Sequence, residues 1–397
     1  GKVKYDEFGR ATESYLNNEE QNCSGTLTDV LKQFTVFPDN PAQLTTTEYD
    51  YLDRPLSTTV YGLSAGDATT QMSYTFGPDR YGVTQFMKQI TLPNGNISQS
   101  FTDSKGQTTS SNQIGAGETY WTSFQYNKLS ELLNVRDAND AVTYYTYDNF
   151  GRKTSINHPD SGMSTFKYDL ASRLKESTNA NLLAAGQKVL YKYNINQLTN
   201  VIFPTHTVEY KYGPVGAPDN GVGRLIYQSD LTGEQYFKYG SLGEVTENKR
   251  IIIDPLGAPR YFTTQFEYDT WGRIRTLIYP DGEKVKHTYD NGGLITHIEN
   301  SDGQVYLENI CYDIFEKRRH VEYGNGTISN YFYEPQQALQ QMQVSTPSGS
   351  LFMSNNYEYD LNSNVTQISN TASAIAINHL GGIETKTFEY DDFNRLR

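Results

Sequence analysis

Cysteine is scarce in this chain of 397 residues, and long apolar runs are missing. The two cysteines, Cys23 and Cys311, lie far apart and in no metal-binding or redox spacing. A disulfide framework is therefore excluded, although a single long-range bridge stays open. Because no run of about 18 apolar residues occurs, we expect no direct membrane insertion. The chain begins at Gly1-Lys2-Val3 without a signal peptide, and an export signal could lie upstream if the chain is an excerpt.

Positive charge is also in short supply. Lys and Arg number 33 against 46 Asp and Glu, so the formal net charge is -13. Nucleic-acid binding needs basic patches, and an anionic bilayer attracts basic segments. We therefore expect no nucleic-acid partner and no docking on an anionic membrane.

The third shortage is of core-forming aliphatic side chains. Hydrophobic residues make up 36% of the chain, a set that counts 32 Tyr but no Gly, and exchanging Tyr for the 32 Gly leaves it at 36%. A typical globular domain has roughly 45–50% on that basis, so a conventional core cannot be filled. The 13% of aromatic residues and the many Val, Ile and Thr nevertheless favour strands over disorder.

What the chain has in abundance is a repeated dipeptide, Tyr-Asp. It starts at Tyr5, Tyr49, Tyr147, Tyr168, Tyr268, Tyr289, Tyr312, Tyr359 and Tyr390. Degenerate copies lie between these, at Phe101, Tyr126, Tyr193, Tyr212, Tyr239 and Tyr333. From Tyr147 to Tyr168, and again from Tyr268 to Tyr289, the step is 21 residues. Periods of about 20–50 residues are typical of elongated arrays in which each unit packs on its neighbours.

The unit from Tyr268 to Asp290 predicts a β-hairpin. Residues 273–279 and 283–289 are short strand-like runs, and Pro280-Asp281-Gly282 between them has the composition of a hairpin turn. The predicted fold class is therefore all-β, a strip of tandem antiparallel hairpins. A one-layer strip leaves its strand edges unpaired unless it curls and closes on itself. Both faces would then meet solvent, which accounts for the shortage of aliphatic residues.

The Tyr-Asp pair marks the turn at the other end of each hairpin. We expect the Asp carboxylate to accept a hydrogen bond from the backbone N–H two residues on. The residue three positions after the Asp, such as Gly9, Gly151 or Gly272, should be left-handed, and the Tyr ring should pack on the ring of the next repeat. Weaker copies carry Asp53, Ser172 or Asn394 at the left-handed position. An Arg comes next, so Asp and Arg can form an ion pair over the turn, which we call the clasp.

We interpret these recurring residues as a structural framework and assign none to catalysis, metal binding or a cofactor. The framework set is Tyr5, Asp6, Gly9, Arg10, Tyr49, Asp50, Arg54, Tyr147, Asp148, Gly151, Arg152, Tyr168, Asp169, Arg173, Tyr268, Asp269, Gly272, Arg273, Tyr289, Asp290, Tyr390, Asp391 and Arg395. The chain is accordingly not expected to be an enzyme.

Three stretches carry a resemblance to a known family. They are YDEFGRATES at Tyr5, YDNFGRKTSINHPDSGMSTFKYD at Tyr147 and YDTWGRIRTLIYPDGEKVKHTYD at Tyr268. They resemble the RHS, or YD, repeat, whose pattern runs from Tyr-Asp-x-x-Gly-Arg through Asp-Gly to the next Tyr-Asp. The resemblance spans nearly the whole chain, from Tyr5 to Arg395.

This resemblance implies a β-strip that spirals into a hollow shell, or cocoon. In bacterial toxin complexes and polymorphic toxins of this family, the shell encloses a C-terminal effector until delivery, and teneurins use a similar shell in cell adhesion. The implied partners are the chain's own C-terminal core or effector region or a neighbouring shell subunit, together with secretion or delivery machinery. The implied location is secreted or at a bacterial cell surface, with the signal outside this chain.

The sequence departs from complete family members after the repeats. The core segment with self-cleaving aspartates and the variable toxin are not found, and the chain stops inside a fresh repeat, YDDFNRLR. We interpret residues 1–397 as a continuous repeat array excerpted from a longer chain, with tolerated insertions near 16–41, 177–188 and 369–382. Asp254-Pro255-Leu256-Gly257 resembles a fragment of the core signature, and we interpret it as a turn.

Signals for chemistry are weak. Residues 62–66 fit Gly-x-Ser-x-Gly, but the hydrolase elbow needs a helix after the Ser, and residues 67–71 favour a loop or strand. The six histidines are scattered, although His287 and His297 flank the Tyr289 turn and could approach each other. Residues 137–140 (DAND) lack the spacing of a calcium loop.

The leading functional hypothesis is a structural shell that encapsulates a cargo polypeptide. The alternative is a cell-surface or wall-associated module whose exposed tyrosines bind carbohydrate or protein, and glycan-array binding lost on replacing those tyrosines would favour it. A third hypothesis, a glycosidase, needs two placed carboxylates that the sequence does not nominate.

Overall fold

The computed structural model describes residues 2–16, 42–63, 66–115, 117–254, 256–313, 315–334, 336–374, 381–391 and 393–397. By their contacts the residues divide into two compact units. Unit 1 comprises Gly1–Thr122, Tyr289–Ile298 and Val305–Arg397, and unit 2 comprises Ser123–Thr288 and Glu299–Gln304.

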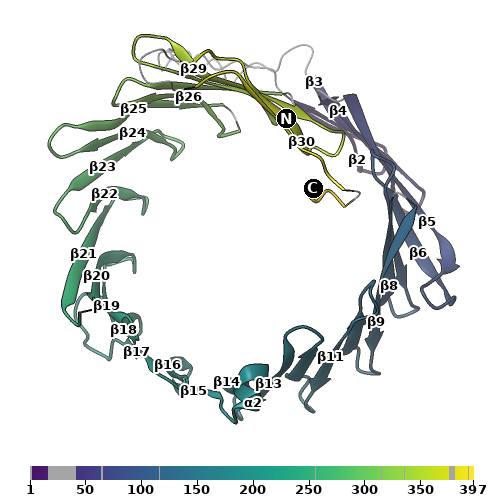
Figure 1. The fold of residues 1–397 in the computed structure, drawn as a ribbon, viewed down its shortest axis with the longest axis horizontal. Coiled ribbons are helices and arrows are strands. Elements are labelled where there is room, and N and C mark those ends of the chain that lie inside the picture. The colour runs from purple at the N-terminus through teal and green to yellow at the C-terminus, as the bar shows by residue number, and fades with distance from the viewer. Residues whose placement is uncertain are drawn as a thin grey trace. The chain divides into compact units, whose positions relative to one another are not determined.

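The described residues are almost entirely β-strand (Figure 1). In chain order the strands are β1 Lys2–Tyr5, β2 Ala11–Leu16, β3 Ala42–Tyr49, β4 Pro55–Leu63, β5 Gly66–Pro78, β6 Thr84–Thr91, β7 Ile97–Thr102, β8 Thr108–Gly115, β9 Glu118–Tyr126, β10 Leu132–Arg136, β11 Val142–Tyr147, β12 Lys153–His158, β13 Gly162–Tyr168, β14 Leu174–Thr178, β15 Val189–Asn194, β16 Gln197–Ile202, β17 Thr207–Tyr212, β18 Leu225–Asp230, β19 Gly233–Tyr239, β20 Val245–Ile253, β21 Pro259–Tyr268, β22 Ile274–Ile278, β23 Lys284–Tyr289, β24 Ile295–Asn300, β25 Val305–Tyr312, β26 Arg318–Tyr323, β27 Ile328–Tyr333, β28 Leu339–Ser345, β29 Leu351–Tyr359, β30 Val365–Asn370 and β31 Glu384–Thr387. One short helix, α2 (Ala180–Ala184), lies between β14 and β15, within the expected insertion near 177–188.

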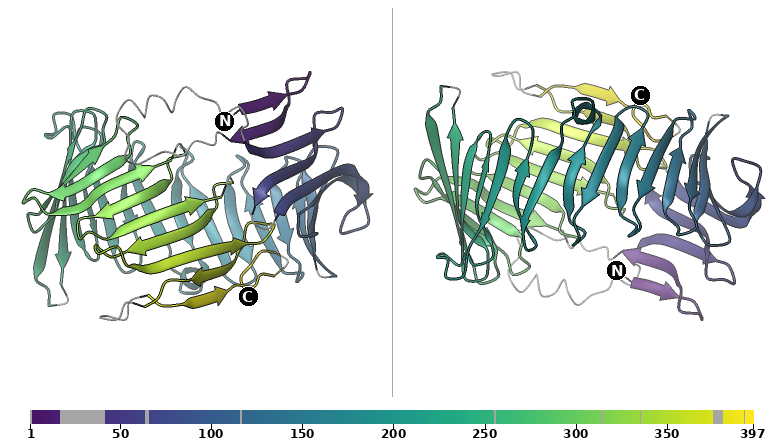
Figure 2. Two further views of the ribbon diagram at one scale, coloured as in Figure 1. Left: turned by 90° about the horizontal axis from the view of Figure 1, so that it is seen from above. Right: turned by 90° about the horizontal axis from the view of Figure 1, so that it is seen from below.

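Within each unit, strands pair antiparallel with the next strand along the chain. In unit 1 this holds from β1 through β8 and from β25 through β31. In unit 2 it holds from β9 through β23. Figure 2 shows successive hairpins lying side by side. The predicted all-β strip of antiparallel hairpins is therefore confirmed.

The strip has two edges that differ in their loops. Loops that lead from an odd-numbered to an even-numbered strand form what we call the clasp edge, and they include Asp148–Arg152 and Asp269–Arg273. Loops that lead from an even-numbered to an odd-numbered strand form the return edge, and they include Leu92–Asn96 and Tyr279–Glu283. The predicted Pro280-Asp281-Gly282 turn lies in the last of these, with Gly282 at φ 94°. Successive loops fall alternately on the two edges because consecutive strands are antiparallel.

The core is small and partly polar. Its apolar centre in unit 1 is Ile310, Val321 and Tyr331, with half-buried tyrosines and leucines packed against them. Serines are as deeply buried, since Ser110 and Ser123 are at most 1% exposed. Side-chain hydrogen bonds between neighbouring strands satisfy several part-buried polar groups. Examples are Gln99 Nε2 to Gln89 Oε1 (2.8 Å), Asn112 Nδ2 to Gln99 Oε1 (2.9 Å) and Gln341 Nε2 to Asn356 Oδ1 (2.9 Å). Hydrogen-bonded polar pairs thus help to hold neighbouring strands together, as aliphatic packing does in an ordinary core.

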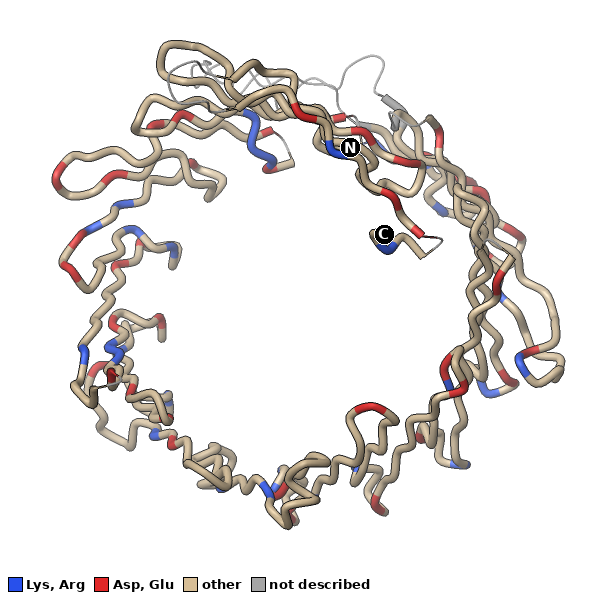
Figure 3. Tube along the Cα trace, in the orientation of Figure 1, with Lys and Arg blue, Asp and Glu red and all other residues tan. Residues whose placement is uncertain are grey.

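Charge is spread along the strip. Figure 3 shows Lys and Arg interspersed with Asp and Glu in both units. Within the part of the chain that is described, no helix is long and apolar enough to cross a membrane.

Candidate functional site: the Tyr-Asp clasp

The clasp loop begins with the Asp of each Tyr-Asp pair. In the copy at Asp148, the backbone N–H of Asp148 donates to Arg152 O (2.9 Å), and that of Gly151 donates to Asp148 O (3.0 Å). The Asp148 carboxylate oxygen Oδ1 accepts from the backbone N–H of Phe150 (2.9 Å) and of Arg152 (3.1 Å). Gly151 has φ 74°, so this is a type I turn closed by a bulge with a left-handed residue. The predicted bond from Asp to the N–H two residues on is therefore present.

The same left-handed position holds residues other than Gly. Asp53, Ser172 and Asn394 have φ of 62°, 63° and 58° there. Short polar side chains tolerate this conformation because they bond locally.

The Arg completes the clasp through a two-pronged ion pair. Arg152 donates Nε–H to Asp148 Oδ2 (2.7 Å), and its Nη2 lies 2.7 Å from the same oxygen. Five further pairs have Nε to Oδ2 distances of 2.6–2.7 Å: Asp6 with Arg10, Asp50 with Arg54, Asp169 with Arg173, Asp269 with Arg273 and Asp391 with Arg395. The side-chain hydrogen bond from Arg152 lowers the pKa of Asp148, against a smaller opposing effect of desolvation.

The clasp at Arg152 also holds the next repeat. Arg152 Nη1 donates to Asp169 O (3.0 Å) and to Ser172 Oγ (3.1 Å). Its guanidinium lies over the Tyr168 ring at 4.9 Å, and the Tyr168 hydroxyl donates to Lys153 O at 2.9 Å. One Arg therefore joins its own turn to the turn and the ring of the following hairpin.

The tyrosine contact recurs along the strip. A motif tyrosine hydroxyl donates to the carbonyl of the residue that follows the Arg position of the preceding repeat. The pairs include Tyr49 to Ala11, Tyr193 to Leu174, Tyr268 to Val245, Tyr312 to Ile295, Tyr333 to Arg318, Tyr359 to Leu339 and Tyr390 to Val365.

The expected packing of one motif ring on the next is wrong at these positions. The ring of Tyr49 lies under Arg10 at 5.1 Å, and that of Tyr193 lies under Arg173 at 4.8 Å. A cation over an aromatic face is favourable, and the arginine needed for the turn is already there. The motif tyrosine therefore packs against the arginine of the preceding repeat and does not stack in a row with other motif tyrosines.

The remaining framework residues depart from this arrangement in their burial or in the residue at the Arg position. Tyr5, in the first repeat, is exposed, whereas Tyr147 is half-buried and desolvation raises its pKa. At Tyr289 the pair continues normally, since Asp290 Oδ1 accepts from the N–H of Gly292 (2.9 Å) and Leu294 (2.8 Å). Leu294 stands at the Arg position there, so this copy keeps the turn with an apolar residue in place of the cation.

Other features that the sequence singled out are turns. Asp254 N donates to Ala258 O (2.9 Å) around Gly257 at φ 83°, which confirms the turn interpretation. Residues 137–141 form a hairpin loop of the same kind. Among the described residues, no cluster of His, Cys, Asp and Glu could hold a metal ion.

The segment at 62–66 joins two strands, because β4 ends at Leu63 and β5 begins at Gly66. The helix that a hydrolase elbow needs is replaced by a strand. Ser64 itself lies outside the described residues, as do Cys23 and His379, most of the insertion expected near 16–41 and part of that near 369–382.

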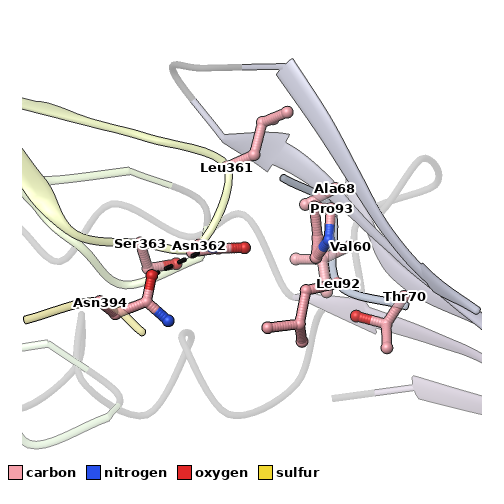
Figure 4. A pocket seen from close by; sticks show the side chains of 9 residues that line it. All are labelled: Val60, Ala68, Thr70, Leu92, Pro93, Leu361, Asn362, Ser363 and Asn394. Atoms are coloured by element: carbon pink, nitrogen blue, oxygen red, sulfur yellow. Dashed lines mark hydrogen bonds between the residues drawn. The ribbon is translucent and has the colours of Figure 1, made fainter. Parts of the chain in front are cut away.

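A second set of contacts lies inside unit 1, where three late clasp loops meet the return edge of early strands. The Phe393 ring packs edge-on against the Tyr120 ring at 4.9 Å. Gln336 Nε2 donates to Leu44 O (3.0 Å) and to Tyr61 O. The same late loops and early strands line a pocket of about 260 Å³ (Figure 4), whose lining residues are Val60, Ala68, Thr70, Leu92, Pro93, Leu361, Asn362, Ser363 and Asn394. We call this set of contacts the seam.

Sequence reasoning missed the seam because its partners are far apart in the chain. One signal was available: the second residue after the clasp Asp is often large and apolar, as in Phe8, Leu52, Phe150, Trp271 and Phe393.

Comparison with known proteins gives a match in structure alone. No family model matches the sequence, and no curated protein matches it. The chain is similar over 100% of its length to the crystal structure of TcdB2-TccC3, with TM-score 0.79 and 17% sequence identity. It is similar over the same length, again at 17% identity, to TcdB2-TccC3-Cdc42 with TM-score 0.78 and to a mutant of the Photorhabdus luminescens Tc holotoxin pore with TM-score 0.79.

The chain has the RHS/YD-repeat shell fold. This confirms the expected fold class. The chain spans about a fifth of the matched chains, 21% of each of these three. At this level of identity the likeness concerns the fold alone, and the activities of the matched assemblies are not assigned to this chain.

Proposed function

We propose that this RHS/YD-repeat strip is a structural wall segment that encloses a cargo polypeptide, without catalytic activity of its own. The observation that carries the proposal is the full-length match to chains of toxin assemblies at TM-score 0.79. The cargo we propose is the parent chain's own C-terminal effector region, and the neighbours are further shell segments. The location we propose is outside the bacterial cell or at its surface.

The chemistry of the strip supports a role as a wall. The clasp uses its carboxylates and cations on each other and on backbone groups, which leaves them committed to the framework. Buried positions are often Ser, Thr or Asn rather than aliphatic residues. We propose that the inner wall is mixed polar with limited apolar patches, so that an enclosed polypeptide finds little surface on which to build a core and stays unfolded.

The continuous repeat array over 1–397 is part of this proposal. Clasps occur at Asp6, Asp148, Asp269 and Asp391, from near the start of the chain to near its end. The framework residues would then act on stability and spacing alone.

The test is electron cryomicroscopy of the intact parent protein combined with limited proteolysis. We expect an enclosed volume bounded by this strip and a polypeptide inside that resists protease. The same polypeptide expressed without the strip is the control, and it should be digested quickly. A particle without an enclosed volume, or a cargo segment cut equally fast in both samples, would overturn the proposal.

A further inference from the structure

The hairpin formed by β20 and β21 (Figure 1) extends beyond the strand that follows it. β21 pairs with β20 from Pro259 to Gln265. Its pairing with β22 begins only at Gln265, opposite Ile278. Residues 259–264 of β21 therefore form an open sheet edge within the described part of unit 2. At the usual rise per residue this edge is roughly 20 Å long.

Half of the backbone groups along this edge face away from the hairpin. The N–H of Asp254 donates to Ala258 O across the hairpin (2.9 Å), so the groups of Ala258 face β20. Successive residues of a strand present these groups to opposite sides, so those of Arg260 also face β20, whereas those of Pro259 and Tyr261 face outward. Pro259 suits such a position because its missing N–H costs no bond in the sheet. The outward N–H and C=O of Tyr261 have no strand opposite them among the described residues of unit 2.

The side chains along this edge are exposed on both faces of the hairpin. Every residue from 256 to 262 is exposed. Tyr261 and Phe262 are consecutive in the strand, so their rings lie on opposite faces, and they are 60% and 42% exposed. A strand placed beside β21 therefore meets one aromatic ring on each face, and such pairs stabilise strand association.

The charge beside the open edge is positive. The Arg260 side chain is 68% exposed, and the Lys249 ammonium group lies over the Tyr261 ring at 5.4 Å. Asp254 is the one acidic residue between positions 249 and 264. Its carboxylate accepts from two backbone N–H groups of its own turn (both 2.9 Å), lies 3.4 Å from Arg260 Nε and is 17% exposed. The edge therefore complements an acidic partner.

We propose that residues 259–264 of β21 bind an extended polypeptide segment with acidic residues, which adds to the sheet as a strand. An extended backbone repeats its N–H and C=O groups at the spacing that this edge presents, which is why open sheet edges take strands. The main-chain bonds centre on Tyr261, and acidic side chains of the segment pair with Arg260 and Lys249. A short pairing is usual in this sheet, since β22 itself joins β21 only through residues 265–268. The proposal does not depend on whether the strip encloses cargo.

Fluorescence anisotropy with a labelled synthetic peptide tests the binding. The probe is a short peptide of alternating Val and Thr with Glu at both ends, and the full chain is titrated into it. We expect saturable binding that R260E weakens roughly fivefold, because a charge pair is lost. A peptide with Lys in place of Glu should bind R260E more tightly than the wild-type chain. The control R275E makes the same charge change at an exposed position of β22 and should leave binding unchanged.

Two substitutions at Tyr261 test the main-chain contact. Y261A removes the ring, and Y261P removes both the ring and the outward N–H. Because this N–H faces away from β20, the proline removes no bond within the hairpin. We expect Y261P to bind the peptide roughly fivefold to tenfold more weakly than Y261A does. Far-ultraviolet circular dichroism and chemical denaturation check that both variants keep the stability of the β-structure.

Hydrogen exchange measured by mass spectrometry locates the peptide on the full chain. Residues 259–264 should exchange more slowly when the peptide is bound, because the outward N–H groups become hydrogen-bonded. A wild-type chain that does not bind the peptide would overturn the proposal. Equal affinities of Y261A and Y261P, or protection confined to other segments, would overturn it as well.

Discussion

The arginine of the repeat acts on two hairpins at once. Arg152 pairs with Asp148 in its own turn, donates to Asp169 O in the next turn, and covers the Tyr168 ring. A guanidinium can do this because it is planar and presents several donors in a fixed fork, whereas an ammonium offers a compact charge. At the residue scale, the motif is therefore a joint between neighbours as well as a turn.

The tyrosine hydroxyl should contribute to stability in proportion to its hydrogen bond. Tyr312 donates to Ile295 O at 2.9 Å from a half-buried position. We expect Y312F to lower the free energy of unfolding by about 1 kcal/mol, because the carbonyl loses its partner. Chemical denaturation of the purified chain measures this. The control is Y51F at a loop tip that is 89% exposed, and an equal loss in both variants would contradict the assignment.

The clasps should make stability depend on pH in the acid range. The side-chain hydrogen bond from Arg152 lowers the pKa of Asp148, and that from Arg173 lowers the pKa of Asp169. A carboxyl with a depressed folded-state pKa stabilises the fold fully above its unfolded pKa, near ~3.9. That contribution is lost as the pH falls through the lower, folded-state pKa.

We therefore expect the melting temperature of the wild-type chain to fall in this window, and the variant D148N with D169N to show a smaller fall. Differential scanning calorimetry at a series of pH values measures the difference. The control D281N removes a carboxylate from a return-edge turn. A wild-type pH profile that the double variant reproduces would show that the clasps do not titrate with folding.

At the scale of the hairpin, the bulge sets the register. Strand pairing shifts by one residue at the motif tyrosine in many hairpins, for example between Thr146 and Tyr147 and between Glu267 and Tyr268. The extra residue is the one two positions after the clasp arginine, which the pairing skips: Thr154 in the first case and Arg275 in the second. This shift twists the strands and returns the chain with the correct face toward its neighbour.

The left-handed position gives a matched pair of variants. Gly272 has φ 77°, and an added Cβ would meet no atom within 4 Å, so backbone strain alone decides the effect. We expect G272V to cost roughly 1–2 kcal/mol in the free energy of unfolding. G272N should cost much less, because Asn394 already adopts φ 58° at the equivalent position. Denaturant titration compares the two, and equal losses would mean that something other than φ limits this site.

At the scale of the whole molecule, stability comes from repetition rather than from a large core. In the described part of the chain, ten hydrophobic residues are classed as buried, and Phe101 and Val321 are the deepest at 2% exposure. Each hairpin is held by its neighbours, so stability should accumulate along the strip as a sum of local and nearest-neighbour terms.

The heat capacity change on unfolding should therefore be low. Exposure of apolar surface raises this quantity and exposure of polar surface lowers it. We expect a value per residue below the roughly 12–15 cal/mol/K of ordinary globular domains. Calorimetric enthalpies measured at several melting temperatures, set by pH, provide the slope. A value at or above the ordinary range would require buried apolar surface beyond that seen in the strip.

The sequence by itself determined what is local. The strands, the Pro-Asp-Gly turns, the bond from Asp to the N–H two residues on, and the left-handed residue at Gly151 or Asn394 all depend on a few consecutive residues. Their physical causes, backbone sterics and short side chains beside the backbone, act within one hairpin. The Asp–Arg pairing was accessible for the same reason.

Only the tertiary structure decided which partner each side chain finds beyond its own hairpin. Tyr168 could have met another ring, but the spacing of adjacent hairpins places it under Arg152 and against Lys153 O. Phe393 could have remained a solvent-exposed tip like Phe150, but the path of the strip in unit 1 places it on Tyr120. Such contacts depend on the summed twist of many hairpins, which no single repeat encodes.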